Sequence, residues 1–288
     1  MNSKRIIGWL FAALGLALLQ ACSAIKLAYN NAPEFGYWWL DGYVDYQGEQ
    51  GPRVRDELAR LHQWHRVNEL PKIADLLQKV QKLAATDIAP AQVCGVFNDT
   101  RERFNAVTTN VENAAAVLAS SLKAEQLAHI QRKFDKGNDD WRREWLTLSA
   151  PERLQRRLKS NTERAEEFYG KLEERQVATL RATLENSGFD AQMSVTERLR
   201  RQQDLMQTLK AVSGKTSADD VLPALRAYVA RANNSPNPAY RAYSDKLTQE
   251  SCASFALLHN STTPEQRRRA VGRLAAYERD ARELSSQR

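Results

Sequence analysis

Hydrophobic residues recur every three or four positions along most of this chain, the spacing that places them on one face of an α-helix. The first such run begins after Pro52, a residue that favours the first helical position, and continues to Leu83. Pro71 interrupts the run and is expected to kink or split it, because proline lacks the N–H that an interior helical position donates. Further helices are predicted at residues 90–119, 123–147, 151–186, 190–212, 218–232, 238–259 and 264–285.

The same pattern shows no sustained alternation of hydrophobic and polar residues, which would indicate β-strands. The 288 residues include only 12 Gly and 9 Pro, too few for a turn-rich all-β protein of this length. The segment SGKTS at 213–217 is the best candidate for a domain boundary, but the predicted helices on its two sides have similar character. We therefore expect an all-α fold, an elongated bundle of about eight or nine helices with essentially no sheet, in a single domain over residues 33–288.

The N-terminus departs from this amphipathic pattern. Lys4 and Arg5 precede an uncharged stretch of about 14 residues, 6–19. That stretch is shorter than the roughly 20 apolar residues of a transmembrane helix and has the length of the hydrophobic region of a signal peptide. The segment LQAC at 19–22 follows directly and resembles the lipobox of bacterial lipoproteins. The resemblance implies cleavage before Cys22 and attachment of acyl chains, palmitate among them, to that residue.

The resemblance to lipoproteins also implies an order of segments: a signal peptide at 1–21, a lipidated tether at 22–32, and then the helical domain. Two or three acyl chains hold a protein firmly on a bilayer, whereas one chain binds only marginally. The residue after Cys22 is Ser23 rather than Asp, which by similarity to enterobacterial sorting favours the outer membrane, with the protein facing the periplasm. The alternative is a plain secretory signal peptide in which the cysteine falls at this position by chance.

The net charge and the cysteines of the chain also bear on the expected periplasmic location. Removing residues 1–21 lowers the formal net charge from +7 to +5, a basic balance that suits anionic partners. With Cys22 acylated, Cys94 and Cys252 remain of the three cysteines, and such an even pair in an oxidising periplasm favours a disulfide. The alternative is two buried free thiols on separate helices. A redox enzyme is not expected, because the chain contains no Cys-x-x-Cys motif.

One local pattern precedes several of the predicted helices. It occurs in DIAPAQ (87–92), SLKAEQ (121–126), LSAPE (148–152) and STTPEQ (261–266). Helix capping explains it, because a Ser or Thr accepts from free N–H groups, Pro suits the first turn, and Glu or Gln three residues on reaches back. These segments also resemble the Leu-Thr-x-x-Gln motifs of Spy/CpxP-type periplasmic chaperones, which are basic, all-helical proteins with a concave surface.

A second resemblance covers nearly the whole chain. It is carried by CSAIKLAYNNAPEFGYWWLDGYVDY from Cys22, by RVRDELARLHQWHRVNELP from Arg53, and by TPEQRRRAVGRLAAYERDARELS from Thr263. These segments are similar to an uncharacterised family of Gram-negative lipoproteins, known only as a domain of unknown function. The resemblance implies a lipoprotein with an all-helical fold and no established activity, and it carries over no catalytic residues.

Two groups of residues could support chemistry. His62, His65 and Glu69 stand three and four residues apart, so one helix face could present them together to a metal ion. The sequence lacks the stronger His-Glu-x-x-His motif, so we expect packed or surface residues and no metal or other cofactor. Asp41 and Asp45 could act as paired carboxylates if their segment is helical, as glycosidases require. Packing of the surrounding aromatic residues is the simpler interpretation.

Aromatic and basic residues suggest a surface for partners. The aromatic rings near the N-terminus could contact a membrane interface or a partner, or could pack in the core. The arginine clusters could form a solvated surface with ion pairs, or a basic face for anionic lipids and polymers. The candidate interaction surface comprises Tyr37, Trp38, Trp39, Tyr43, Arg156, Arg157, Arg267 and Arg268.

These observations lead to two hypotheses about function. The first is a non-catalytic cell-envelope lipoprotein that binds a protein or an anionic envelope polymer through helix grooves and basic faces, in the manner of a chaperone. The second is an envelope hydrolase, acting on peptidoglycan or another glycan through the carboxylates and histidines of the N-terminal region. We expect the first, with the membrane as partner through the lipid anchor. Export makes a nucleic-acid partner improbable.

Overall fold

The computed structural model describes residues 25–287. These residues form helices joined by short turns and include no strand, so the all-α class is confirmed. The helices are α2 (Ala32–Val44), α3 (Gln50–Asn68), α4 (Leu70–Ala84), α5 (Pro90–Asn110), α6 (Glu112–Ser121), α7 (Ala124–Trp145), α8 (Ala150–Tyr169), α9 (Glu174–Glu185), α10 (Ala191–Val212), α11 (Ala218–Asn233), α12 (Pro238–Asn260) and α13 (Pro264–Ser286). Residues 25–30 are helical as well.

The expected number of eight or nine helices is wrong for this part of the chain, because the predicted segments divide more often than their periodicity indicates. The helix predicted at 151–186 ends at Tyr169, where Gly170 has a φ of 76° that residues with a Cβ adopt at a cost. The helix predicted at 90–119 breaks at Val111, between α5 and α6. The expected break at Pro71 is confirmed, since α3 ends at Asn68 and this proline lies in the first turn of α4.

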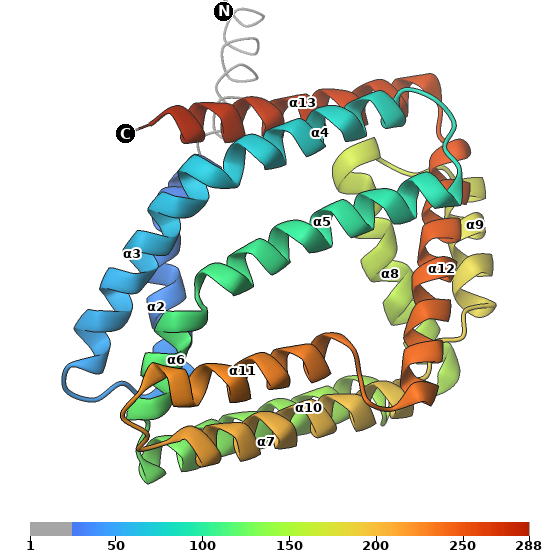
Figure 1. Cartoon of the computed structure of the whole chain (residues 1–288). Helices are drawn as coiled ribbons and strands as arrows, with labels where there is room; N and C mark the ends of the chain where they lie inside the picture. Colours follow the sequence, from blue (N-terminus) through green and yellow to red (C-terminus); the bar gives the residue numbers. More distant parts are fainter. Residues whose placement is uncertain (1–24, 288) are drawn as a thin grey trace, which may run out of the picture.

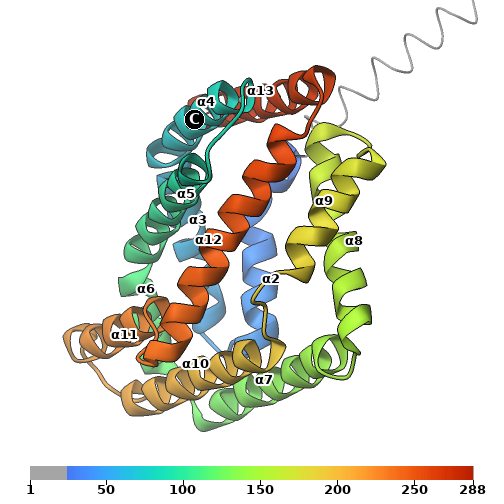
Figure 2. The ribbon, with the colours of Figure 1, turned by 90° about the vertical axis from the view of Figure 1, so that its right-hand side faces the viewer.

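The helices line four sides of a frame (Figure 1). The helix pair α4 and α13 forms one side, α2 and α3 the next, α7, α10 and α11 the third, and α8, α9 and α12 the fourth. Helix α5 crosses the frame and packs against α12. A view turned by 90° shows α12 between α5 and the pair of α8 and α9 (Figure 2). The helices therefore do not lie side by side in the elongated bundle that the sequence analysis expected.

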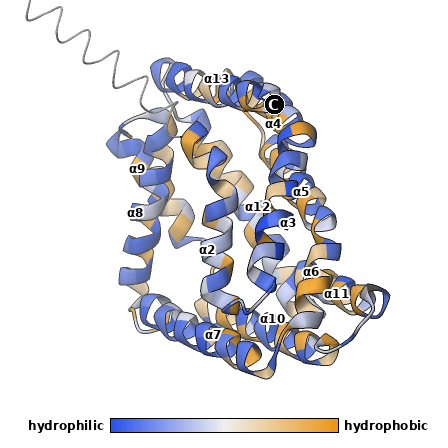
Figure 3. Cartoon of the chain, turned by 90° about the vertical axis from the view of Figure 1, so that its left-hand side faces the viewer, coloured by the Kyte–Doolittle hydropathy of each residue, from blue (hydrophilic) through white to orange (hydrophobic). Residues whose placement is uncertain are grey.

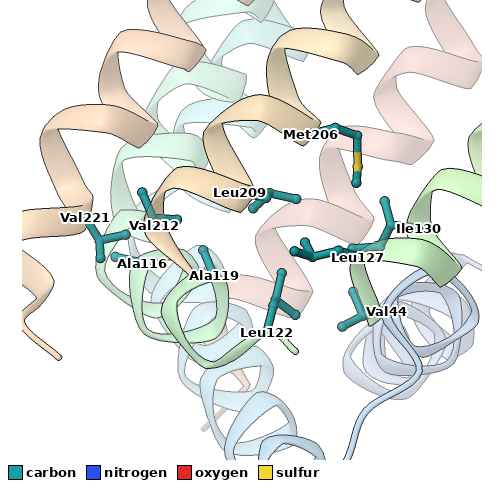
Figure 4. Close-up of a cluster of buried hydrophobic side chains, with 10 residues drawn as sticks. All are labelled: Val44, Ala116, Ala119, Leu122, Leu127, Ile130, Met206, Leu209, Val212 and Val221. Carbon is teal, nitrogen blue, oxygen red and sulfur yellow. The ribbon is translucent and has the colours of Figure 1, made fainter. Parts of the chain in front are cut away.

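The hydrophobic core is divided among four clusters. The largest joins the end of α2 to α6, α7, α10 and α11, and Figure 4 shows its ten buried side chains pointing toward one another. A second cluster joins α8, α9, α12 and α13, and smaller ones lie between α4 and α13 and between α5 and α12. Figure 3 colours most of α8 and α9 as hydrophilic, because each of these helices buries one face only.

A disulfide links α5 to α12. The Sγ atoms of Cys94 and Cys252 lie 2.01 Å apart, so the expected pairing is confirmed. Cys252 is fully buried beside Ile88, Val93 and Ala256. The two cysteines stand 158 residues apart in sequence. A cross-link over so long a loop is worth roughly 4–5 kcal/mol in the chain-entropy account of disulfides.

The N-terminal end of the described chain contacts α13. Residues 25–30, which the sequence analysis assigned to a tether, are helical. Lys26 Nζ lies 3.3 Å from Asp280 Oδ1, and Tyr29 packs against the apolar cluster that contains Leu70 and Leu284. The expected signal peptide and the expected acylation at Cys22 lie outside the described residues. Between residues 25 and 287, none of the helices has both the length and the apolar character needed to cross a bilayer.

Candidate functional site

The frame has two junctions where a pair of glutamines joins neighbouring helix turns. At the first corner, where α2 turns into α3 and α6 turns into α7, Gln126 Nε2 donates to Gln50 Oε1 at 2.7 Å, and Gln50 Nε2 donates to Gln126 Oε1 at 3.2 Å. Gln126 also donates to the carbonyl of Asp45, and Gln50 to the carbonyl of Ser121. Gln126 therefore joins the start of α7 to the end of α2, and Gln50 joins the start of α3 to the end of α6.

The second corner, where α8 turns into α9 and α12 turns into α13, repeats this arrangement. Gln176 Nε2 donates to Gln266 Oε1 at 2.7 Å, and Gln266 Nε2 donates to Gln176 Oε1 at 3.0 Å. Gln176 also donates to the carbonyl of Ser261, and Gln266 to that of Lys171. All four polar atoms of this buried pair are hydrogen bonded, which is the condition for burying amides without a large cost.

One glutamine of each pair stands in a segment that the sequence predicts to cap a helix. Gln126 and Gln266 stand in the predicted capping segments, and their side-chain oxygens accept from the N–H groups of Lys123 and Thr263, as expected of helix caps. Gln50 and Gln176 were missed. Their side-chain oxygens accept in the same way from the N–H groups of Gln47 and Glu173, and this spacing of three residues was the signal available.

A cavity of about 700 Å³ lies beside the second corner. Six helices contribute to its wall: α4, α5, α8, α9, α12 and α13. Its wall is mostly apolar and includes Val80, Leu83, Val96, Leu180, Leu258 and Leu274. Binding sites for small ligands have this size and this apolar character, with a few polar groups at defined places. The cavity is therefore the candidate functional site.

The disulfide fixes one wall of the cavity. Phe97 stands one helical turn after Cys94 on α5, and Phe255 stands one turn after Cys252 on α12. Both phenylalanines line the cavity, and their exposed fractions of 38% and 44% leave their rings in contact with solvent. The cross-link between α5 and α12 therefore holds two exposed aromatic rings at the opening of an apolar cavity.

The two cationic groups that line the cavity both lie on α8. Arg157, Asn161 and Arg164 are separated by four and three residues, so they share one face of that helix, and all three line the cavity. The Arg157 guanidinium is half-buried and donates to the carbonyl of Leu184 at 3.3 Å and to Ser187 Oγ at 3.1 Å. Burial lowers the pKa of Arg157, which nevertheless remains charged at neutral pH.

Glu250 is the carboxylate that lines the same end of the cavity. It accepts from the Gly188 N–H at 2.9 Å and from Ser187 Oγ at 3.1 Å. The Lys246 Nζ atom lies 3.8 Å from the Glu250 carboxylate. Backbone and side-chain donors therefore already hold this negative charge, whereas Arg164 is exposed and forms no ion pair within residues 25–287.

A neutral histidine lies at another part of the wall. His259 is almost fully buried, its Nε2 lies 2.8 Å from the carbonyl oxygen of Thr86, and its Nδ1 lies 2.8 Å from the Tyr169 hydroxyl. A carbonyl only accepts, so Nε2 carries the hydrogen and Nδ1 accepts from Tyr169. Burial lowers the pKa of His259, and burial raises the pKa of Tyr169 to about 12. Both groups are therefore uncharged at neutral pH.

Comparison with known proteins identifies the family of the chain. The family model of DUF6279, a family of unknown function, matches residues 42–241. The chain belongs to this family. No curated protein and no solved structure matches the chain significantly. The matched region contains the first corner and α8 and α9 of the second, while Gln266 and Cys252 lie beyond it.

The candidate catalytic residues of this DUF6279 chain do not converge. Asp41 accepts from the N–H of Tyr46, five residues on in the turn after α2. His65 Nδ1 contacts the Tyr29 hydroxyl at 3.0 Å, while Glu69 faces Lys72 and Arg103.

Burial also lowers the pKa of His62 and that of His65. Within the described residues, no group of three histidine, cysteine or acidic side chains is placed to hold a metal ion.

The predicted aromatic surface is divided between core and solvent. Tyr37 is buried, with the Arg55 guanidinium 3.6 Å from the centre of its ring, and Tyr43 packs against the first corner. Trp38 and Trp39 have exposed fractions of 63% and 65%. Only these two of the four aromatic residues are available to a partner.

The four predicted arginines lie in different environments. Arg156 is exposed and pairs with Glu144 at 3.2 Å, whereas Arg157, the next residue, faces the cavity. Arg267 pairs with Asp87 and donates to Thr262 Oγ1 at 3.3 Å. Arg268 is exposed. The arginines therefore do not form one basic face, and Arg157 is the one that lines the candidate site.

Proposed function

We propose that this protein is a non-catalytic lipoprotein of the cell envelope that binds an apolar ligand in the cavity beside the second corner. The observation that carries this proposal is the cavity itself, with its mostly apolar wall and its two arginines on α8. An enclosed apolar surface gains about 0.8 kcal/mol for each methylene that a ligand buries in it, which is enough to select apolar ligands over polar ones.

Binding rather than chemistry is supported by the state of the polar groups in the wall. Both ring nitrogens of His259 are hydrogen bonded, and Glu250 is held by donors from the turn after α9. A hydrolase needs a base within reach of a nucleophile or a water. The hydrolase hypothesis rested on Asp41 and Asp45 together with His62, His65 and Glu69. Within the described residues, no side-chain hydrogen bond joins any two of these groups.

The anchoring part of the proposal rests on sequence. Acyl chains on Cys22 would hold the protein on the outer membrane, facing the periplasm. The exposed Phe35, Trp38 and Trp39 of α2 follow that cysteine closely, and aromatic rings favour the interface of a bilayer. These observations support a membrane partner for the N-terminal helices. The same apolar cavity would also suit an apolar segment of an envelope protein, as in a chaperone.

Titration of the purified full chain with the neutral fluorophore N-phenyl-1-naphthylamine tests the binding. We expect one saturable site whose affinity Ala165→Leu lowers, because Ala165 lines the cavity and a larger side chain takes up part of its space. Ala128→Leu is the matched control, since Ala128 is an exposed helical alanine on α7. No saturable binding, or equal binding by the Ala165→Leu variant, would contradict the proposal.

Metabolic labelling with palmitate tests the anchor separately. The proposal expects label on the wild-type protein and none on Cys22→Ser, with the wild type recovered in the outer-membrane fraction. A wild-type protein without label would remove the lipid anchor from the proposal and leave the cavity untouched.

A further inference from the structure

We infer that the ligand of the cavity is a single-chain amphiphile with an anionic head group, whose acyl chain lies in the cavity and whose head contacts the arginines of α8. This inference rests on the proposed function, since it names the chemical class of the apolar ligand. Free fatty acids and lysophospholipids share this chemistry, since each has one acyl chain and one carboxylate or phosphate.

The distribution of polar and apolar groups along α8 carries the inference. Arg157, Asn161 and Arg164 face the cavity over the two turns before Ala165, and Ala165, Phe168 and Tyr169 face it at the C-terminal end of the helix. From Arg157 to Tyr169 the helix rises by roughly 18 Å. The wall therefore changes from cationic to apolar along one direction, as a ligand with a charged head and an apolar chain requires.

The charge balance at the polar end favours an anion. Two arginines face the cavity there, and Glu250 opposes them. The Glu250 carboxylate already accepts two hydrogen bonds and has Lys246 nearby. Arg164 is exposed and has no acidic partner in the described part of the chain. An incoming carboxylate or phosphate would therefore meet an available guanidinium.

The apolar end favours a single head group. Leu180, Leu258, Ala270 and Leu274 surround it, and the Tyr169 hydroxyl is committed to His259. No arginine or lysine lines the cavity beyond Arg164 on α8. A second charged group at this end would be buried without a partner, which costs several kcal/mol in a protein interior. A ligand with charges at both ends is therefore disfavoured.

Equilibrium dialysis of the purified full chain against labelled ligands below their critical micelle concentrations tests the inference. The probes are palmitate, palmitoyl-lysophosphatidate and the uncharged monopalmitoylglycerol, with octanoate and dodecanoate as shorter carboxylates. We expect one saturable site for the two anions and weaker binding of the uncharged glyceride. Affinity should rise about fourfold for each methylene added to the carboxylate until the chain fills the cavity.

Variants separate the head-group contact from the cavity. Arg164→Glu should weaken binding of the anions by roughly five- to tenfold and leave monopalmitoylglycerol unchanged, because only a charged head meets the reversed charge. Arg268→Glu is the matched control, since Arg268 is an exposed helical arginine that forms no ion pair in the described part of the chain and does not line the cavity. Ala165→Leu should weaken binding of every long-chain probe. Circular dichroism and thermal unfolding of each variant verify that it is folded.

Each outcome of these experiments either supports or overturns the inference. A preference for anions that Arg164→Glu abolishes supports the inference, with the tighter of palmitate and the lysophospholipid identifying a free fatty acid or a membrane lipid as the source. Equal binding of charged and uncharged chains at a site sensitive to Ala165→Leu overturns the inference and leaves the proposed function standing. Displacement of N-phenyl-1-naphthylamine by an amphipathic helical peptide but not by palmitate also overturns it. A cavity that binds none of these overturns both.

Discussion

The two corners of the frame share one hydrogen-bonding device and differ in what it encloses. Gln50 and Gln126 join the helix turns of the first corner, as Gln176 and Gln266 join those of the second. At the first corner ten buried apolar side chains meet, and small residues such as Ala116 and Ala119 bring the helices close together (Figure 4). At the second, six buried residues adjoin a cavity of about 700 Å³.

This difference shows that the glutamine pairs set the geometry of the turns, while the side chains beyond them decide whether a corner is filled. Reciprocal amide bonds tie helix starts to helix ends at both corners and need no particular packing further along the helices. The first corner acts as a closed core, and the second holds the cavity that we propose as a binding site. Matched substitutions at the two corners therefore test whether the first is filled and the second is hollow.

The largest expected effect concerns the disulfide, which has no counterpart at the first corner within the described residues. Replacing Cys94 and Cys252 together by serine should lower the free energy of unfolding by roughly 4–5 kcal/mol, because the unfolded chain regains the freedom of a long loop. Urea unfolding measures the loss. Amides that exchange only through global unfolding should exchange faster by the same free energy, in α6 and α7 as well as in α5 and α12. An unchanged free energy of unfolding by both measurements would contradict the expected effect.

Breaking the glutamine pairs should cost less, and unequally. Gln176→Ala leaves the buried Gln266 amide without its partner and should lower the free energy of unfolding by about 2–3 kcal/mol. Gln126→Ala, which removes an equally buried glutamine from the first corner, should cost about 1 kcal/mol, since the partner it leaves, Gln50, is only half-buried and can bond to water instead. The exposed Gln131 of α7 provides the control, and Gln131→Ala should change stability by less than about 0.5 kcal/mol. Equal losses for Gln176→Ala and Gln126→Ala would contradict this difference between the corners.

Enlarging a small residue should distinguish the filled corner from the hollow one. Ala116→Leu places a larger side chain in the closed first corner and should cost about 1–3 kcal/mol by overpacking. Ala165→Leu places the same side chain beside the cavity and should change the unfolding free energy by less than about 1 kcal/mol. Thermal unfolding compares the two. A loss as large for Ala165→Leu would show that no space of the described size is available there.

The smallest expected effect is an acid-dependent loss of stability at the second corner. Burial lowers the pKa of His259 in the folded protein, so the folded state takes up a proton less readily than the unfolded state, whose pKa is near 6.5. The stability that neutral His259 contributes is therefore present above pH about 6.5 and is lost as the pH falls below it. Arg267 and Asp87 are the charged groups that also act on this histidine.

Unfolding measured between pH 7 and 5 for the wild type and His259→Gln checks this sign. The wild type should lose more stability than the variant on acidification, although His62 and His65 contribute in the same direction to both proteins. Identical slopes against pH would show that His259 does not couple to folding in this range.

Periodicity and local motifs predicted much of the fold. The helix ends after residue 190, the break at Pro71 and the partnership of Cys94 with Cys252 followed from proline placement, spacing and cysteine count. The break at Gly170 did not, because a single glycine in a helical pattern does not reveal that its φ is positive. The capping role of Gln126 and Gln266 was visible in sequence, but their partners were not, since the contacts join residues 76 and 90 positions apart.

The candidate site was less predictable than the fold. Leu180 and Leu258 look like core residues in the sequence, and apolar spacing does not tell whether facing helices close together or leave a space. The residues singled out for chemistry, Asp41 and His65, lie outside the cavity. Arg157 was included in the predicted surface among other arginines, and only the fold distinguishes it from Arg156, which points away to Glu144.

The most direct test of the central claim is a methyl NMR titration of the full chain with palmitate below its critical micelle concentration. The account predicts saturable shifts for methyl groups at the cavity, those of Leu180, Leu184 and Leu258, and no shift for Leu127 and Met206 in the closed first corner. Shifts of equal size at both corners, or none at the cavity up to saturation, would contradict the claim that only the second corner is built to hold a ligand.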